Sequence, residues 1–185
     1  MKVVLLYLRR MDQAVFWRIR FNIENIVPSV KHGGGGLMVW CCFSSKGLGP
    51  LIKIEGKMDR LAYIQILEKH LLPFISIKFN EKGYLFQQDN APVHTGEGWI
   101  TTKKIKILPN WPSQSPDLNP IEHLWSEFER RIRNRPKHPK IIRELEIALQ
   151  DEWAQIPEYV YVDLVKSVPR RIEACIVNKG WPTKY

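Results

Sequence analysis

The sequence predicts a single α/β domain in which strands come first and helices follow. Its 185 residues are 44% apolar and 25% charged, the usual balance of a globular chain with one substantial core. Runs typical of strands all lie in the first 108 residues, and the strongest helical pattern begins at residue 121. No repeat or low-complexity segment divides the chain, so we expect residues 1–185 to form one domain.

A meander of short strands is predicted near the start of the chain. Residues 3–8 form a continuous apolar run typical of a buried strand, and residues 37–43, LMVWCCF, form a second run of this kind. The turn-rich segment 44–50 then leads to residues 51–55, LIKIE, which alternate apolar and polar as a half-buried strand does. This pattern indicates strands joined by at least one hairpin.

A helix and two further strands are predicted next. Asp59 is a suitable N-cap for a helix whose apolar side chains recur at helical spacing, and we expect that helix to end near Pro73. A short strand is predicted within residues 84–92, which end in polar and turn-forming residues, and another at residues 104–108, KIKIL. These segments predict strands on either side of a crossover helix.

Helices are predicted for the last third of the chain. The first begins at residue 121 and has one apolar stripe facing the core. Others are expected at residues 141–155 and 159–178, where Gly180 suits the helix end and Pro169 is a suitable start for a second segment. The stripe of the first helix consists of Ile121, Leu124, Trp125, Phe128 and Ile132.

The charge of the chain favours a polyanionic partner such as DNA. The sequence has 28 Lys and Arg against 19 Asp and Glu, a formal net charge of +9. The densest basic stretch, residues 130–140, either follows a DNA backbone or forms a solvated helix face. The candidate DNA-binding residues are Arg130, Arg131, Arg133, Arg135, Lys137 and Lys140.

The cysteines and the apolar runs exclude two classes of protein. Cys41, Cys42 and Cys175 offer neither a disulfide framework nor the spacing of a structural zinc site. The longest apolar runs are too short to cross a bilayer. We therefore expect a soluble protein in a reducing compartment, with no membrane partner.

Two carboxylates are candidates for metal binding. A carboxylate after a strand and another near a helix start can bind a divalent cation, and Asp89 and Glu122 occupy such places, with His94 near enough in sequence to support them. Each has a structural alternative: Asp89 closes the strand in an Asx turn, Glu122 completes a capping box with Asn119, and His94 makes an ordinary hydrogen bond. Two carboxylates alone do not specify a two-metal site.

Two long motifs, QQDNAPVHT at residues 87–95 and WPSQSPDLNPIEHLW at residues 111–125, closely resemble the catalytic segments of mariner-superfamily transposases. Residues 30–44, 49–60 and 168–185 resemble the same family, in the same order. The resemblance implies a ribonuclease H-like fold, with a mixed central sheet flanked by helices. It also implies a DDE endonuclease that cuts and joins double-stranded DNA in cut-and-paste transposition.

The same resemblance implies a site of two aspartates and a glutamate that holds two Mg²⁺ or Mn²⁺ ions. Asp89 matches the second aspartate and Glu122 the glutamate, with His94 supporting. Both steps of the family's reaction, hydrolysis and joining of the freed 3′-hydroxyl, are phosphoryl transfers served by these metals. A homodimer and, in a eukaryotic host, a nuclear location are further expectations.

Three departures from the family pattern stand out. The family's first aspartate ends the first strand in a Ser-Asp-Glu context, which residues 3–8 lack, and Asp12 lies where the family has a non-catalytic turn. The 33 positions from Asp89 to Glu122 are slightly fewer than usual, which predicts a shortened helix within residues 96–104. A helix-turn-helix region that recognises transposon ends is not expected in the chain.

Two kinds of function follow from these departures. The first is a metal-dependent endonuclease and strand transferase whose activity is impaired because the first strand region is altered. The alternative is a non-enzymatic DNA-binding module, or a decayed transposon fragment without a selected role. The sequence leaves these alternatives open.

Overall fold

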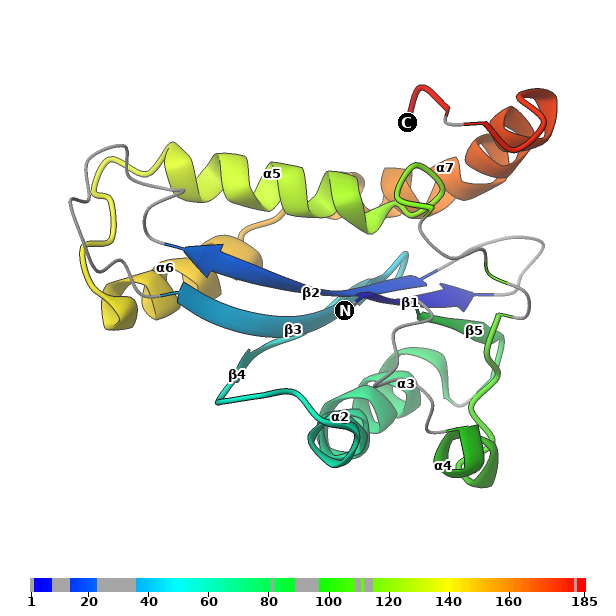
Figure 1. Cartoon of the computed structure of the whole chain (residues 1–185), viewed down its shortest axis with the longest axis horizontal. Coiled ribbons are helices and arrows are strands. Elements are labelled where there is room, and N and C mark those ends of the chain that lie inside the picture. Colours follow the sequence, from blue (N-terminus) through cyan, green and yellow to red (C-terminus); the bar gives the residue numbers. More distant parts are fainter. Residues whose placement is uncertain are drawn as a thin grey trace.

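The computed structural model describes residues 2–7, 14–22, 36–80, 82–88, 97–108, 111, 115–181 and 183–185. Within them lies a five-stranded sheet of order β4-β3-β2-β1-β5, with α5 and α7 on one face and α2, α3 and α4 on the other (Figure 1). The strands are β1 (Lys2–Tyr7), β2 (Ala14–Asn22), β3 (Gly36–Ser44), β4 (Gly47–Ile54) and β5 (Tyr84–Gln88). The helices are α2 (Arg60–Ile66), the π turn η1 (Leu67–Leu71), α3 (Leu72–Phe79), α4 (Glu97–Thr102), α5 (Ile121–Arg133), α6 (Ile142–Ala154) and α7 (Glu158–Val177).

Among the residues described, the sheet is antiparallel in its four strand pairs and has one parallel bridge. That bridge joins Phe86 of β5 to Ile107. The Phe86 N–H donates to the Lys106 carbonyl at 2.6 Å, and the Leu108 N–H donates to the Phe86 carbonyl at 2.8 Å. The strand expected at residues 104–108 is therefore a short bridged segment, and it makes the sheet mixed.

Strand β1 lies between β2 and β5 and is antiparallel to both, so β2 and β5 run in the same direction. Val3 pairs with Gln88 at the end of β5, whereas Tyr7 pairs with Tyr84 at its beginning. The last residue of β1 therefore lies beside the first residue of β5, and the end of β5 lies beside the beginning of β1. This placement decides which residues can meet at the end of β5.

The outer edge of β4 is closed by side chains from α6. The Gln150 amide donates to the Leu51 carbonyl, and the Trp153 indole N–H donates to the Gly49 carbonyl, both at 2.8 Å. An open edge strand exposes such carbonyls to pairing with another chain. Helix α6 thus covers this edge while it packs against α5.

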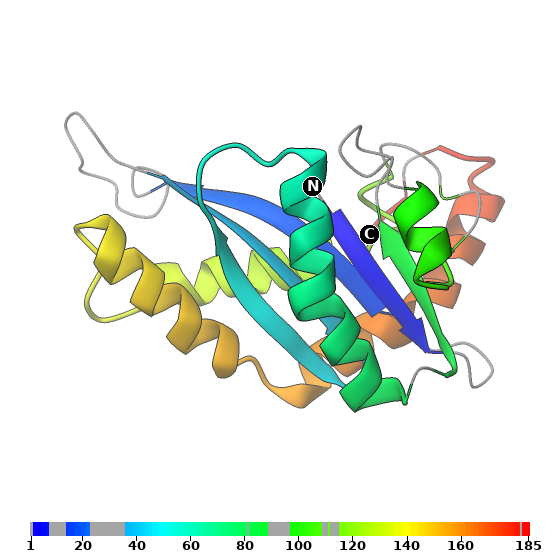
Figure 2. The ribbon, with the colours of Figure 1, turned by 90° about the horizontal axis from the view of Figure 1, so that it is seen from below.

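The helix predicted after Asp59 begins as expected, because the Asp59 carboxylate accepts a hydrogen bond from the Ala62 N–H at 2.8 Å. Its predicted end near Pro73 is wrong. A π turn precedes the proline, and the chain continues through α3 as one long helix along the sheet (Figure 2). Because Pro73 lies in the first turn of α3, its missing N–H falls where a helix start tolerates it. The helix ends at Phe79, followed by Asn80 in the left-handed conformation, with φ at 46°.

Helix α7 is continuous, so the second segment predicted to start at Pro169 is wrong. The proline φ is compatible with a helix, and the loss is one main-chain hydrogen bond. Val165, Val168 and Arg171 are buried around it. Packing of this face outweighs the local cost.

No helix in the described part of the chain is long and apolar enough to span a membrane.

The predicted stripe of α5 is confirmed, since all five of its apolar side chains are buried. Three aromatic rings join this helix to α6. Phe128 meets Trp153 edge-on at 5.4 Å, and Trp125 lies 5.7 Å from Phe128 and 6.2 Å from Trp153 between ring centroids. Such aromatic contacts add stabilisation beyond the burial of apolar area. They fix α5 relative to the sheet and α6.

Gly49 is required by close packing, and its replacement tests the core. An alanine Cβ at this position would lie 1.8 Å from the Sγ of Cys42, which is buried on the neighbouring strand β3. We expect Gly49→Ala to lower the free energy of unfolding by about 1–3 kcal/mol, measured by urea denaturation. The matched control is Gly98→Ala, where a Cβ meets nothing within 4 Å. It should be neutral or stabilising by up to about 1 kcal/mol. Equal effects of the two substitutions would contradict the packing account.

Candidate functional site

The two predicted carboxylates belong to the end of β5 and the start of α5. Gln88 is the last residue of β5, and its side-chain oxygen accepts a hydrogen bond from the Tyr63 hydroxyl at 2.8 Å. Asp89 and His94 lie outside the described residues. Glu122 is half-buried in the first turn of α5. A carboxylate there is favoured by the partial positive charge of the helix N-terminus.

The capping box considered for Glu122 is wrong, because α5 begins one residue later than such a box requires. Pro120 occupies the N-cap position and makes no side-chain cap bond. The Glu122 N–H donates to the Asn119 carbonyl at 3.3 Å, and the Asn119 N–H donates to the Pro116 carbonyl at 3.2 Å. Main-chain turns thus order the start of α5.

Backbone register places no acidic residue beside the end of β5 on the neighbouring strands. Gln88 lies across from Val3 of β1, and the next row contains Lys2 of β1 and Trp17 of β2. The sequences of these strands, KVVLLY and AVFWRIRFN, contain no Asp or Glu. Among the residues that the structure describes, no three acidic, His or Cys side chains gather as a metal site.

Helix α4 is held beside this region by Glu68 of the π turn. The Glu68 carboxylate accepts a hydrogen bond from the Trp99 indole N–H at 3.0 Å and forms an ion pair with the Lys103 ammonium at 3.1 Å. These two partners, Lys103 first, hold the pKa of Glu68 below its ordinary value. The short α4 lies within residues 96–104, where the sequence predicted a shortened helix. Sequence reasoning did not find Tyr63 or Glu68, because their partners are 25 and 31 positions away.

A buried arginine of α7 supports the loop that leads into α5. The Arg171 side chain is 2% exposed and donates to the Asp117 carbonyl at 2.8 Å. Burial lowers the pKa of Arg171, and burial together with the Arg171 charge lowers the pKa of His123. Sequence reasoning did not single out Arg171, since nothing distinguishes it from the neighbouring Arg170.

The arginines of the predicted DNA-binding stretch have partners within the protein. Glu127 pairs with Arg130 and Arg131, both at 2.8 Å, and Glu129 pairs with Arg133 at 2.7 Å. These pairs are three or four residues apart along α5. They reduce the positive field that the sequence alone suggested for this helix.

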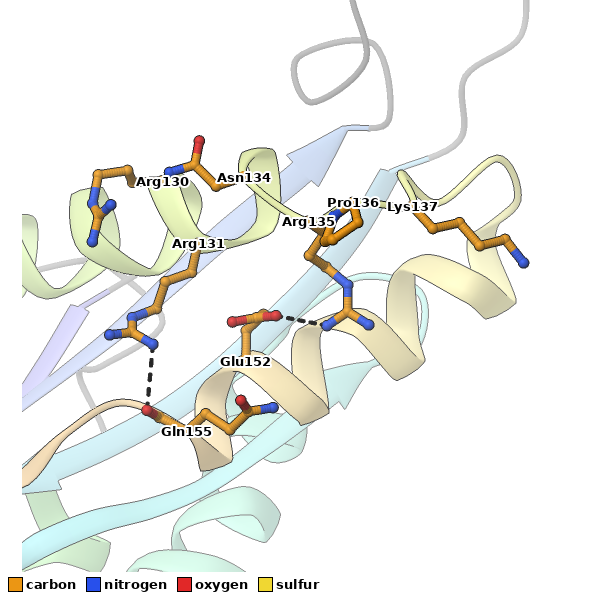
Figure 3. A pocket seen from close by; sticks show the side chains of 8 residues that line it. All are labelled: Arg130, Arg131, Asn134, Arg135, Pro136, Lys137, Glu152 and Gln155. Carbon is orange, nitrogen blue, oxygen red and sulfur yellow. Dashed lines mark hydrogen bonds and ion pairs between the residues drawn. The ribbon is translucent and has the colours of Figure 1, made fainter.

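Two of these arginines also connect α5 to α6. Figure 3 shows Arg131 and Arg135 pointing toward α6. Arg135 pairs with Glu152 at 2.7 Å and Asp151 at 3.2 Å, and Arg131 donates to the Gln155 carbonyl at 3.3 Å. The stretch therefore has a structural role.

An open hollow of about 650 Å³ lies at this junction of α5 and α6. In Figure 3, Arg130 and Lys137 point away from Glu152 and Gln155. Lys137 and Lys140 are exposed. The hollow thus keeps accessible cations at its rim. Its lining consists of Arg130, Arg131, Asn134, Arg135, Pro136, Lys137, Glu152 and Gln155.

Comparison with known proteins gives one family. The model of the DDE superfamily endonuclease family matches residues 29–143, which include the end of β5 and the whole of α5. The Tcb1 transposase of Caenorhabditis briggsae is 45% identical over 169 residues, and the Tc1 transposase of Caenorhabditis elegans is 43% identical over 172 residues. Each alignment covers 90% of this chain and 60% of the relative, so the chain spans about three fifths of their length.

Solved structures give the same fold. The catalytic domain of Mos1 mariner transposase superposes with a TM-score of 0.73 at 18% identity, covering 92% of this chain and 83% of that domain. The Mos1 mariner paired end complex with Mn has a TM-score of 0.76 at 18% identity, over 91% of this chain and 56% of that one. The Mos1 catalytic domain has been solved with Mg as well as with Mn.

The connection between α5 and α6 predicts unequal effects of two arginine substitutions. Arg135, in the segment after α5, is 25% exposed and pairs with two acids of α6, whereas Arg133 is 53% exposed and pairs only along α5 among the contacts described. We expect Arg135→Ala to cost about 1–2 kcal/mol of unfolding free energy and Arg133→Ala about 0.3–0.5 kcal/mol. Urea denaturation of both variants measures the difference. Similar losses would mean that Arg135 is as weakly coupled as a surface pair.

The ion pairs of Glu127 should make part of the free energy of unfolding depend on pH. Hydrogen bonds from Arg130 and Arg131 lower its pKa below the ordinary value of 4.5. Its stabilising contribution is therefore complete above that value and is lost as pH falls through the lower folded pKa. We expect Glu127→Gln to reduce the fall in unfolding free energy between neutral and acid pH. An unchanged pH dependence in this variant would disprove the assignment.

Proposed function

Because the chain belongs to the DDE superfamily of endonucleases and resembles Tc1/mariner-type transposases, we propose that it binds duplex DNA and that its cutting and joining chemistry is impaired. One observation carries the proposal of impairment. Strand β1, which pairs with β5, and strand β2 beyond it contain no acidic residue, although they flank the point where the chain reaches Asp89. A third carboxylate of the family site is therefore missing from these strands.

Phosphoryl transfer between DNA strands requires two metal ions held by several converging carboxylates. We assign Asp89 and Glu122 as the surviving ligands, with His94 supporting them. Two carboxylates suit one hard divalent cation such as Mg²⁺ or Mn²⁺, but they provide too little negative charge for a pair of ions. When bound, such a cation would supply positive charge to a DNA phosphate, and Glu122 would orient it. No reaction through a second metal is proposed.

Asp12 does not replace the missing ligand in this proposal. It follows β1, and the end of β1 pairs with the beginning of β5, at the edge of the sheet opposite Gln88. The residue itself lies outside the described part of the chain. The direction of β1 supports leaving it out of the site.

DNA binding is proposed for the surface formed by the end of α5 and the segment before α6. Of the six predicted residues, Arg130, Arg133, Lys137 and Lys140 have exposed side chains that suit phosphate contacts. Arg131 and Arg135 hold α6 instead, and contribute through the summed charge. The Mos1 paired end complexes make DNA a consistent partner. A homodimer and a nuclear location are proposed from the relatives alone.

The proposed binding surface predicts a loss of salt dependence when its lysines are removed. The affinity for a duplex of arbitrary sequence should fall as salt rises, because phosphate contacts release counterions. In Lys137→Ala/Lys140→Ala, the slope of log affinity against log salt should decrease in magnitude by about 1.8, or roughly 0.9 for each phosphate that is no longer neutralised. Fluorescence anisotropy with a labelled duplex at several salt concentrations measures both slopes.

The matched control removes the same charge from the opposite face of the sheet. Lys69→Ala/Lys78→Ala affects exposed lysines on the π turn and α3. Its slope should change less than that of the first variant. Equal changes would contradict the assigned surface, and binding that ignores salt would contradict the electrostatic account altogether.

A further inference from the structure

Arg171 is buried between three segments that are far apart in sequence. Its Nε donates to the Ser167 hydroxyl at 2.7 Å, one turn earlier on α7, and its Nη1 donates to the Asp117 carbonyl at 2.8 Å. Its guanidinium also lies over the Tyr185 ring, 4.7 Å from the centroid. The planar fork of arginine allows these three contacts at once, and lysine has no equivalent geometry.

The C-terminal residues also contact Asp117 and Arg171. The Thr183 N–H donates to the Asp117 carboxylate at 3.0 Å, and the Tyr185 N–H donates to the Thr183 hydroxyl at 3.3 Å. Asp117 therefore holds Arg171 through its carbonyl and the tail through its side chain. We call Asp117, Arg171, Thr183 and Tyr185 the C-terminal clamp.

A short series of main-chain hydrogen bonds connects the loop that contains Asp117 to the first turn of α5, which contains Glu122. The Asn119 N–H donates to the Pro116 carbonyl, the Glu122 N–H to the Asn119 carbonyl, and the Leu124 N–H to the Pro120 carbonyl, at 3.2–3.3 Å. The apolar stripe of α5 fixes the rotation of the helix, but its first turn has no side-chain cap. The clamp adds a restraint on the loop that leads into that turn.

Keeping a guanidinium in this place is costly. A buried cation loses its hydration, and burial is the main cause that lowers the pKa of Arg171. The neighbouring Arg170 is exposed on the same helix. A purely apolar residue would fill the space between α7 and the loop, but it would leave the Asp117 carbonyl without this donor.

We propose that Arg171 is a positioning residue, which through the C-terminal clamp fixes the first turn of α5 and with it the Glu122 carboxylate. The proposal rests on the role of Glu122 as a metal ligand in the proposed function. Its mechanical part, the restraint of the turn, does not depend on that role. The two parts are therefore tested by separate measurements.

Amide hydrogen exchange tests the restraint. In Arg171→Met, the Asn119, Glu122 and Leu124 amides should exchange at least about tenfold faster than in the native chain, as expected for a loss of about 1.4 kcal/mol in local opening. The exchange rate of the Ile132 amide, at the other end of α5, should change little. The matched control Arg170→Met should leave all four amides unchanged.

A milder variant keeps the test valid if Arg171→Met does not fold. Asp117→Ala removes the acceptor of the Thr183 N–H but keeps the carbonyl that binds Arg171. It should accelerate exchange at Asn119 and Glu122 in the same direction, with a smaller change. Uniform acceleration along α5, or no difference from Arg170→Met, would overturn the clamp.

Binding of Mn²⁺ to the full chain, measured by water proton relaxation, tests the functional part. The affinity component that disappears in Glu122→Gln should weaken several-fold in Arg171→Met and stay unchanged in Arg170→Met. An unchanged component in Arg171→Met would overturn the positioning role. If Glu122→Gln has no effect on Mn²⁺, the ligand assignment in the proposed function fails, and the exchange data alone then judge the clamp.

Discussion

The packing of α5 against the sheet and α6 is the interaction on which the remaining features depend. Its five buried side chains and the contacts of Trp125 and Phe128 with Trp153 leave this helix one rotation and one position. The helix carries Glu122 at its first turn and the arginine stretch at its last. Core packing therefore positions the helix that carries both the candidate ligand and part of the candidate DNA surface, one near each end.

The direction of β1 is the second constraint. Strand β1 separates β2 from β5, and its residues next to the end of β5 are Val3 and Lys2. Carboxylates that hold two metals must converge at one place, and strands are the usual means of bringing them there. The first residues of β1 lie beside the end of β5, and its last residue, Tyr7, lies beside the beginning of β5. The register of β1 and the composition of β1 and β2 are the observations behind the proposal of an incomplete site.

Local patterns predicted the fold well where one periodicity dominated. The stripe of α5 was clear because burial on one face leaves a regular signal, and residues 51–54 of the strand expected at 51–55 belong to β4. The helix boundaries predicted at Pro73 and Pro169 were wrong, because a π turn before Pro73 and buried packing around Pro169 on α7 offset the local cost of each proline. The family motifs indicated Glu122 as a candidate ligand, which stays a prediction, and the main-chain turns at the start of α5 were not revealed by any pattern.

The partners of Arg135 and Arg171 could not be found from the sequence. The stretch of residues 130–140 looked like a strongly basic surface, because the acids that pair with Arg135 lie 16 and 17 positions later on α6. Arg171 looked like any surface arginine, although its contacts reach Asp117, 54 positions earlier. Electrostatic patterns in sequence describe net charge, whereas the field at a surface depends on pairs that only the fold brings together.

The chain has the fold of the Mos1 transposase catalytic domain, and we propose that it lacks the complete set of metal-binding carboxylates of the DDE family. The most direct measurement is nicking of supercoiled plasmid DNA by the purified chain with Mn²⁺, at a salt concentration where the chain binds DNA. The account predicts nicking no faster than that of the Glu122→Gln variant under the same conditions. Metal-dependent nicking that disappears in both Asp89→Asn and Glu122→Gln would contradict it.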